Sequence, residues 1–399
     1  MQSGPKQPHA GNPGEIALLK QIRARAAQLS RGGLRLGIGD DCALLRVGPS
    51  EDLAVTTDLS ISGRHFRLDW QTPESIGHRT LARGLSDLAA MGARPVAAFL
   101  SLGLPTELVQ NPKRREPWPG GKTWPDEKTW PGGKTWLVRF LDGFLALANA
   151  SQSPLAGGDL AESPLPVADI VLIGAVRRGQ ALLRSCAQPG QLLYVTGTLG
   201  GAAAGLARLA QSAESESGAP QTKSGKARSD AARSDAARSD AATLESAQPF
   251  PPRIPAKLQS LLAPHLNPQP RIAQGQWLAR RSLASAAIDL SDGLSTDLAH
   301  LCEESHVAAE VDAAALPVHP GATLAQALHG GEDYELLFTA PPAARVPRRI
   351  AGIPVTRIGR ILRPRKGRPQ VALVNLQAGA QARTKPAQPL TPQGWEHFS

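Results

Sequence analysis

The sequence predicts a mixed α+β protein built from two domains. A chain of 399 residues is long enough for roughly two domains that each bury a core of their own. Helical and extended patterns alternate along the chain without a regular strand–helix–strand rhythm, which favours α+β packing over a doubly wound parallel sheet. Two tandem repeats interrupt these patterns, and we assign them to inserts.

Composition sets the expected domain boundaries. We predict a disordered leader at residues 1–13, a first domain at 14–180 and a second domain at 181–399. An insert at 112–135 carries a six-residue repeat around Lys-Thr-Trp, and one at 212–252 carries Arg-Ser-Asp-Ala-Ala three times. Because neither repeat has the apolar periodicity of a core element, we expect a surface loop in the first case and disorder or weak helicity in the second.

Apolar spacing predicts the individual elements. We expect helices at 15–29, 73–91, 137–150, 294–305 and 323–328, with a further helix after the glycines that follow 192–197. Strands are expected at 53–57, 96–104, 168–176, 192–196, 286–290, 309–311 and 334–339. The stretch 157–159, Gly-Gly-Asp, is expected to be a turn.

Charge and cysteine content exclude several classes. The net charge of +10 resides in residues 341–399, which hold eleven Lys or Arg and one Glu. A basic segment of this kind can bind nucleic acid, but steering of a phosphorylated substrate or solubility explains it better, since no aromatic–basic motif accompanies it. Three scattered cysteines, a polar N-terminus and the absence of a long apolar run predict a cytoplasmic protein without disulfides or membrane spans.

Five short stretches place an aspartate beside small residues at the end of an apolar run. They contain Asp41, Asp58, Asp87, Asp159 and the pair Asp289 and Asp292. Carboxylates gathered in one site repel each other unless cations are present. Mg²⁺ prefers such oxygen ligands and leaves positions for substrate phosphates, so the sequence indicates a metal-dependent enzyme that handles phosphates.

Each aspartate also has a structural interpretation. Asp41 could finish a turn, Asp58 could end a strand, Asp292 could cap a helix, and Asp87 could pair with Arg83 one turn away. Five such stretches together favour a site. The chain contains neither a Walker A sequence nor a dinucleotide-binding glycine fingerprint, so ATP use would fall outside the P-loop and protein-kinase classes.

These motifs resemble the thiamine-monophosphate kinase family. The resemblance is carried by eight stretches, which are Gly37-Ile-Gly-Asp-Asp-Cys-Ala, Thr56-Thr-Asp, Gly63-Arg-His-Phe, Leu85-Ser-Asp-Leu-Ala-Ala-Met-Gly-Ala, Gly157-Gly-Asp, Ala287-Ile-Asp-Leu-Ser-Asp-Gly, Gly330-Gly-Glu-Asp-Tyr-Glu-Leu and Gly394-Trp-Glu-His-Phe. It implies a PurM-like fold of the aminoimidazole-ribonucleotide-synthetase superfamily, with an N-terminal domain that forms a homodimer and a C-terminal α+β domain. It also implies transfer of a phosphoryl group from ATP to thiamine monophosphate with several Mg²⁺ ions.

The resemblance further implies three groups of site residues. Metal ligands would be Asp41, Thr56, Thr57, Asp58, Asp87, Asp159, Asp289 and Asp292. ATP would contact Gly158, Arg184 and Ser291, and thiamine monophosphate would contact His65, Glu332 and Trp395. The chemistry is suitable, because Arg184 can neutralise a phosphate and Trp395 offers an aromatic face to a cationic or flat ring.

Two departures and three alternatives accompany this interpretation. The segment after Asp159 is Leu-Ala-Glu-Ser, where the family usually has two threonines, an arginine and a glycine; the family also tends to have Asn where Gly84 stands. The alternatives are selenophosphate synthetase, an aminoimidazole-ribonucleotide synthetase, and a nucleic-acid-binding protein. Selenophosphate synthetase is disfavoured because residues 1–36 contain no cysteine.

Overall fold

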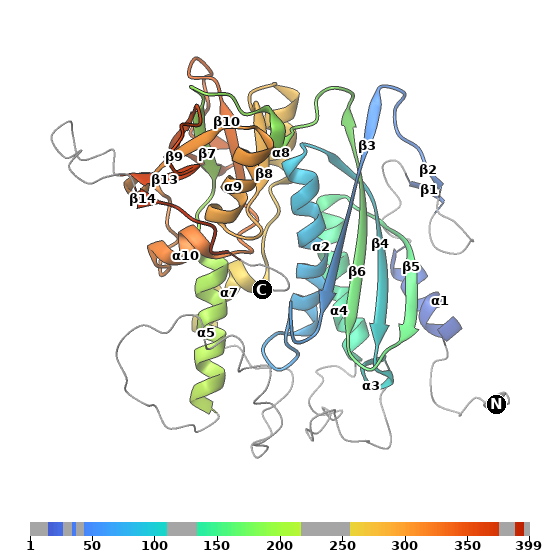
Figure 1. Ribbon diagram of the computed structural model, residues 1–399. Coiled ribbons are helices and arrows are strands. Elements are labelled where there is room, and N and C mark those ends of the chain that lie inside the picture. Colours follow the sequence, from blue (N-terminus) through green and yellow to red (C-terminus); the bar gives the residue numbers. More distant parts are fainter. Residues whose placement is uncertain are drawn as a thin grey trace, which may run out of the picture.

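A computed structural model describes residues 15–26, 34–36, 44–109, 134–216, 256–374 and 388–394. Asp41, Trp395 and nearly all of both repeat inserts therefore lie outside the described residues. The described chain forms two large β-sheets, one from residues 51–177 and one from residues 192–389, with helices packed on them, and a third sheet of two short strands within residues 34–45 (Figure 1). The mixed α+β class that the sequence predicts is confirmed.

The first sheet has four strands in the order β3-β6-β4-β5. Their bounds are β3 Glu51–Ile61, β4 Arg94–Leu104, β5 Leu155–Glu162 and β6 Val167–Arg177. Neighbouring strands are antiparallel except β4 and β5, which are parallel. Helices α2 (Pro73–Ala90) and α4 (Trp136–Ser151) cover one face of this sheet (Figure 1).

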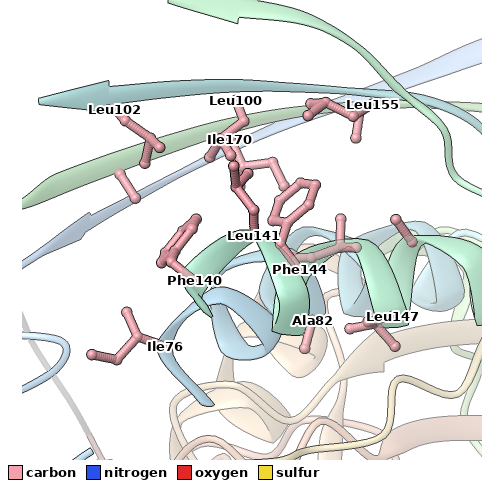
Figure 2. Packing of buried hydrophobic residues seen from close by; sticks show 14 of the residues in the cluster. Ile76, Ala82, Leu100, Leu102, Phe140, Leu141, Phe144, Leu147, Leu155 and Ile170 are labelled. Atoms are coloured by element: carbon pink, nitrogen blue, oxygen red, sulfur yellow. The ribbon is translucent and has the colours of Figure 1, made fainter. Parts of the chain in front are cut away.

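The core of the first domain lies between this sheet and the two helices. Leu100 and Ile170 point from the strands toward Phe140 and Phe144 of α4 (Figure 2). The two helices approach each other closely because Gly77 of α2 lacks a side chain: a Cβ at that position would lie 2.0 Å from the Phe140 carbonyl oxygen. This close packing holds α2 rigidly beneath the sheet.

The second sheet follows the order β14-β13-β9-β12-β7-β10-β8, and β11 pairs with β12. Its strands are β7 Leu192–Thr196, β8 Ala286–Asp289, β9 Ala308–Asp312, β10 Leu336–Ala340, β11 Arg349–Ile350, β12 Ile353–Leu362, β13 Val371–Val374 and β14 Gln388–Pro389. Alternate residues of β8 face different helices. Ile288 joins the core that contains α9 (Leu294–Glu304), whereas Ala287 joins the one that contains α8 (Ile272–Arg280).

Helix α2 connects the two domains (Figure 1). Its last turn places Ala89 and Ala90 in the same core cluster as Leu278 of α8. A Cβ on Gly275 of α8 would lie 1.9 Å from the Ala89 carbonyl oxygen, so only glycine permits the helices to cross this closely. The C-terminal half of α2 is consequently buried between both domains.

The remaining described elements are short or peripheral. They are α1 Glu15–Ala26, β1 Leu34–Leu36, β2 Leu44–Leu45, α3 Thr106–Val109, η3 Arg184–Cys186, α5 Gly201–Glu216, α7 Ala256–Leu266, η5 Ala313–Ala315 and α10 Leu324–His329. Among the helices of the described ranges, none combines the length and apolar character needed to cross a membrane.

Several expectations from the sequence need correction. Residues 157–159 are part of strand β5 and not a turn, because their backbone pairs with β4. Asp58 lies inside β3 and does not end it. Helix α5 extends to Glu216, into the first residues of the segment 212–252 that we assigned to an insert, and α7 was not predicted. Trp136, the last tryptophan of the Lys-Thr-Trp repeat, is a fully buried core residue at the start of α4.

Candidate active site

A polar stripe runs along one side of helix α2 and defines the candidate site. Ser75, Arg79 and Arg83 follow one another at four-residue spacing, and Ser86 and Asp87 continue the stripe one turn later. Residues four apart lie on the same face of a helix. Each of these side chains hydrogen-bonds to a segment outside α2.

Strand β3 contributes the first partners of this stripe. The Thr56 hydroxyl donates a short hydrogen bond to Asp87 Oδ2, and Arg83 Nη2 donates to Asp58 Oδ1 at 3.1 Å. Successive side chains of a strand point to opposite faces of the sheet. Thr56 and Asp58 therefore face α2, whereas Thr57 faces the side of the sheet that the helices leave open.

Strand β8 of the second domain contributes Asp289. The Ser86 hydroxyl donates to Asp289 Oδ2 at 2.7 Å, and Asp289 is 2% exposed. Ser86 and Asp87 are adjacent on α2. The helix therefore contacts Asp289 of the second domain through Ser86 and the Thr56 hydroxyl of the first domain through Asp87. The structure thus brings Thr56, Asp87 and Asp289 together, as the sequence predicts.

The electrostatics of these carboxylates are unfavourable in the absence of a cation. Burial, followed by the negative charge of Asp289, raises the pKa of Asp87 to about 7. Burial likewise raises the pKa of Asp289 to about 6, although the Ser86 hydrogen bond and the Arg184 charge lower it. Burial also raises the pKa of Asp58, against the opposing effect of Arg83. A divalent cation would relieve this repulsion, which is the chemistry expected of a metal site.

The described side chains do not assemble a complete ion-binding cage. Within the described ranges, no three His, Cys, Asp or Glu side chains are arranged to hold one ion. Mg²⁺ usually retains several waters and takes oxygens from substrate phosphates, so one or two carboxylates are sufficient on the protein side. The donor set of Asp58, Asp87 and Asp289 fits such an open site.

The loop between β8 and α9 carries Ser291 and Asp292. Its conformation is fixed by Asp297, whose Oδ2 accepts the backbone N–H groups of Asp292 at 3.1 Å and Gly293 at 3.0 Å. The helix N-cap is Gly293, with φ of 108°, so the interpretation of Asp292 as the capping residue is wrong. The Arg83–Asp87 pairing is also not observed as a hydrogen bond, since Arg83 binds Asp58 instead.

Glu332 lies beside this loop in a strained backbone conformation. Its φ is +67°, a region that side chains rarely adopt, and its N–H donates to the Ser291 carbonyl at 2.8 Å. Arg79 Nη2 donates to Glu332 Oε1 at 2.6 Å, and His265 Nδ1 lies 3.5 Å from Oε2. Burial would raise the pKa of Glu332, but Arg79, His265 and Arg83 together lower it to about 2.

The other acidic residues of the Gly-Gly-Glu-Asp-Tyr-Glu motif are structural. Asp333 accepts the N–H groups of Gly200 at 2.5 Å and Ala202 at 3.1 Å, at the start of α5. Glu335 is nearly fully buried and pairs with Arg271 at 2.5 Å. Of the three acidic residues in this motif, Glu332 alone is directed at the polar stripe of α2.

His65 lies close to the same stripe. Its Nδ1 accepts the Ile61 N–H at 3.1 Å, and its ring lines a small cavity together with Arg79 and Arg83. Arg184, in η3, is exposed, and its positive charge lowers the pKa of Asp87 and of Asp289. Arg184 therefore lies near the carboxylates, and His65 lies beside the arginines of the stripe.

The end of the chain returns to the β8–α9 loop. Gly394 N–H donates to Thr296 Oγ1 at 3.1 Å, and a Cβ on Gly394 would lie 1.9 Å from the Asp292 carbonyl oxygen. Only glycine fits at this contact. Trp395 is the next residue along the chain and lies outside the described residues; the described structure brings its neighbour Gly394 to this loop.

Gly158 and Asp159 are not beside the other site residues. They lie on β5, at the opposite edge of the sheet from β3, three strands or about 14 Å away. The cross-strand register pairs Asp159 with Ser101, Ser101 with Asp169 and Asp169 with Leu59, so Asp159 faces the open side of the sheet. Within one chain, therefore, Asp159 does not join Asp58 and Asp87.

Four residues of this site were not predicted from the sequence. Arg79, Ser86 and Asp297 lie next to predicted residues, and their spacing on α2 and α9 was a usable signal. No sequence signal pointed to His265, because it follows the second insert and is brought to Arg79 only by the tertiary structure. One departure from the family pattern has a local explanation: a Cβ on Gly84 would lie 2.8 Å from Leu172 Cδ1, so glycine fits the packing of α2 on β6.

Comparison with known proteins defines first the class and then the family. Residues 39–176 match the family model described as AIR synthase related protein, N-terminal domain. The thiamine-monophosphate kinase of Salmonella typhimurium is 36% identical over 364 residues, covering 87% of this chain and 90% of that protein. The chain therefore belongs to the thiamine-monophosphate kinase family.

Solved structures agree with this assignment. A thiamine-monophosphate kinase from Stenotrophomonas maltophilia is 36% identical with a TM-score of 0.63, covering 90% of this chain and 96% of that one. AaThiL complexed with AMPPCP and TMP is 24% identical with a TM-score of 0.61, covering 99% of this chain and 100% of that one, and it supports the fold. The family predicted from the sequence motifs is confirmed.

Proposed function

We propose that this protein phosphorylates thiamine monophosphate to thiamine diphosphate, with ATP as the donor and Mg²⁺ as the metal. The proposal rests on one observation: Thr56 of β3 and Asp289 of β8 both contact the end of α2, at Asp87 and at its neighbour Ser86. The chain also shares 36% identity with a thiamine-monophosphate kinase. Phosphoryl transfer requires mainly positioning and neutralisation of charge. The α2 stripe provides fixed side chains for both purposes.

Metal binding is assigned to the carboxylates whose pKa is raised by burial. Asp58, Asp87 and Asp289 would hold Mg²⁺, together with Thr56 and Asp292 and with Asp41 outside the described residues. When bound, the metal would neutralise the phosphate oxygens. Ser86 fixes the Asp289 carboxylate, and Asp297 fixes the backbone of Asp292, so this chain orients its oxygen ligands before any ion arrives.

Substrate binding is assigned to the two sides of the stripe. Arg184 and Ser291 would contact the phosphates of ATP, because Arg184 already acts electrostatically on Asp87 and Asp289. His65 and Glu332 would contact thiamine monophosphate from the side of Arg79. Trp395 would cover the thiamine rings, and the contact of Gly394 with Asp292 supports its delivery to the site.

We further propose that two copies associate through the open face of the first sheet. Leu53, Val55 and Leu59 of β3 are 52%, 60% and 47% exposed on this face. Large apolar side chains clustered on one sheet face are typical of a protein interface. Thr57 and Asp159 lie on the same face at opposite edges, so a symmetric pairing would bring Thr57 of one copy near Asp159 of the other. Gly158 would reach ATP in the same way.

The activity is tested with purified protein, ATP, Mg²⁺ and thiamine monophosphate, and thiamine diphosphate is quantified by chromatography. We expect product to form only when all three additions are present. An Asp292→Asn variant that keeps its fold by circular dichroism is expected to be inactive. If the wild-type protein yields no thiamine diphosphate, the proposed function is wrong; if Asp292→Asn turns over at the normal rate, the metal assignment is wrong.

The shared site is tested by subunit complementation. Asp58→Asn and Asp159→Asn are expected to be inactive separately. If Asp159 acts in the site of the other copy, mixing and reassociating the two variants restores about a quarter of the wild-type activity, since half of the molecules are mixed dimers with one intact site. No recovery in a mixture shown to contain mixed dimers would exclude the shared site. A Val55→Lys variant that remains dimeric would exclude this face as the interface.

A further inference from the structure

A buried Arg–His–Glu cluster joins three distant parts of the chain and is not explained by metal or ATP binding. Arg79 of α2 has 5% of its side chain exposed and His265 of α7 has 2%, while Glu332, from the loop before β10, is partly exposed at 28%. Burial of ionised groups is costly unless their partners are well placed. Such a cluster at the edge of an active site therefore indicates a functional requirement for its geometry.

The hydrogen bonds of the cluster define the protonation of His265. The Arg67 N–H donates to Gln71 Oε1 at 3.2 Å, which turns the Gln71 amide nitrogen toward His265 Nε2, 2.9 Å away. His265 Nε2 then accepts, which leaves the ring proton on Nδ1. Nδ1 lies 3.5 Å from Glu332 Oε2 and 3.2 Å from Arg79 Nη1; since a guanidinium can only donate, Nη1 makes its hydrogen bond to the His265 carbonyl oxygen and not to Nδ1. Burial, followed by the Arg79 charge, lowers the pKa of His265 to about 3, so the ring is neutral.

Arg79 holds both partners at once. Nη2 donates to Glu332 Oε1 at 2.6 Å, and Nη1 donates to the His265 carbonyl oxygen. Each carboxylate oxygen of Glu332 therefore has its own neighbour, Arg79 for Oε1 and His265 for Oε2. The backbone of Glu332 is fixed as well, by its left-handed conformation and by its bond to Ser291. Few degrees of freedom remain to this side chain.

We propose that Arg79 and His265 are positioning residues for thiamine monophosphate: they hold the Glu332 carboxylate ionised and aimed at the cationic part of the substrate. This inference rests on the proposed function and on the assignment of Glu332 to the substrate. Arg79 also lines the small cavity beside His65 and Arg83. Through Arg79 the Glu332 carboxylate therefore adjoins a group of basic side chains, and this pairing of a negative and a positive group suits a ligand that carries a cationic ring and a phosphate.

The cluster also connects the site to α7, the helix that follows the undescribed segment 217–255. Ser75 Oγ donates to the Leu266 carbonyl at 2.7 Å, and His78 Nε2 lies 2.7 Å from the Pro268 carbonyl. The end of α7 is therefore attached to α2 at two positions immediately after His265. This attachment explains how a residue near a long insert can keep a fixed position in the site.

The test compares Michaelis constants for the two substrates. In Arg79→Gln, loss of the charged hydrogen bond is expected to raise KM for thiamine monophosphate about 10- to 100-fold. KM for ATP is expected to stay within about threefold, since Arg79 lies on the far side of the stripe from Arg184. Arg139→Gln is the matched control, because Arg139 makes a 2.6 Å ion pair with Glu74 between α4 and α2 away from the site. Its KM values should not change.

A double-mutant cycle shows whether Arg79 acts through Glu332. If it does, Arg79→Gln combined with Glu332→Gln has the same KM for thiamine monophosphate as Glu332→Gln alone, within about threefold. Multiplied effects of the two substitutions would mean that Arg79 acts independently and would overturn the proposal. So would an unchanged KM in a folded Arg79→Gln protein whose melting temperature alone falls.

The pH dependence of KM gives a readout that a purely structural role would not change. The charged and titratable groups that face Glu332 are Arg79 and Arg83 of α2, His265 of α7, and Asp333 and Tyr334 of its own loop. In Arg79→Gln, only His265 and Arg83 still oppose the effect of burial on the Glu332 pKa, so Glu332 takes up a proton at higher pH than in the wild type. KM for thiamine monophosphate should then rise further as pH falls from 8 to 6, whereas the wild-type value should not show this rise.

A second pair of variants decides the question if Arg79→Gln does not fold. His265→Asn keeps an amide N–H close to the position of Nδ1, whereas His265→Ala removes it. We expect a raised KM for thiamine monophosphate in the alanine variant and recovery in the asparagine variant. Equal KM values in both would overturn the proposal. A wild-type protein that fails to use thiamine monophosphate would instead refute the proposed function, so the two failures are distinguishable.

Discussion

Neutralising Asp87 is expected to stabilise the metal-free protein while it abolishes activity. The pKa of Asp87 rises from an ordinary value of 3.8 to about 7, because burial and the nearby Asp289 disfavour its charge. The folded state therefore retains a proton on Asp87 between pH 4 and pH 7 that the unfolded state has released, and stability falls as pH rises through this window. A rise of this size corresponds to about 4 kcal/mol across the whole window.

Asp87→Asn removes this dependence, since an amide does not ionise. The Thr56 hydroxyl can donate to the amide oxygen as it does to Asp87 Oδ2. Between pH 5 and pH 8, the free energy of unfolding of the variant relative to wild type should increase by about 3 kcal/mol. Taking the difference between the two proteins cancels the titration of all groups outside this cluster.

The measurement is urea unfolding followed by circular dichroism, in EDTA, at pH 5, 6, 7 and 8. Glu74→Gln is the control, because Glu74 is a carboxylate of the same helix that pairs with Arg139. We expect no stabilisation in the control at pH 8. Mg²⁺ should stabilise the wild type at pH 8 and have a smaller effect on Asp87→Asn. A variant that is less stable than wild type by the same amount at every pH would refute the electrostatic reasoning.

Two other predictions follow from packing. Gly394→Ala places a methyl group 1.9 Å from the Asp292 carbonyl oxygen, so the terminal segment must move. KM for thiamine monophosphate should therefore rise several-fold, with little change in melting temperature. Unchanged kinetics would contradict the proposed placement of Trp395 at the site. Trp136→Ala should cost about 3–5 kcal/mol in urea unfolding because Trp136 is 1% exposed and stacks on Phe140 at 5.2 Å. A cost below about 1 kcal/mol would mean that this tryptophan is not a core residue.

The sequence predicted those features that depend on local pattern. Apolar spacing located α2, α4 and α9, since the buried faces of these helices read directly as a 3.6-residue period. Small residues beside aspartates located Asp87 and Asp289, which the fold does bring near each other. In both cases the signal lies within one element, so no knowledge of the tertiary structure is needed.

Contacts between distant segments were not predictable from pattern. Gly157-Gly-Asp159 has the composition of a turn, but its pairing with β4 makes it an edge strand, because tertiary context overrides turn chemistry. The Arg79–His265–Glu332 cluster joins residues separated by 186 and 253 positions. Such a cluster leaves no periodic signal, and its members look individually like an ordinary helix arginine, a stray histidine and a turn glutamate.

The position of α2 connects these observations. Ser86 binds the second domain through Asp289, Asp87 is bound by Thr56 of the first domain, and Arg79 holds Glu332 of the second. A cation that binds Asp87 and Asp289 would therefore lower the free energy of the arrangement in which both domains close on this helix. The same helix carries the side chain that aims Glu332. We expect Mg²⁺ to tighten thiamine monophosphate binding even when ATP is absent, and a substrate dissociation constant that is independent of Mg²⁺ would show that the two halves of the stripe act separately.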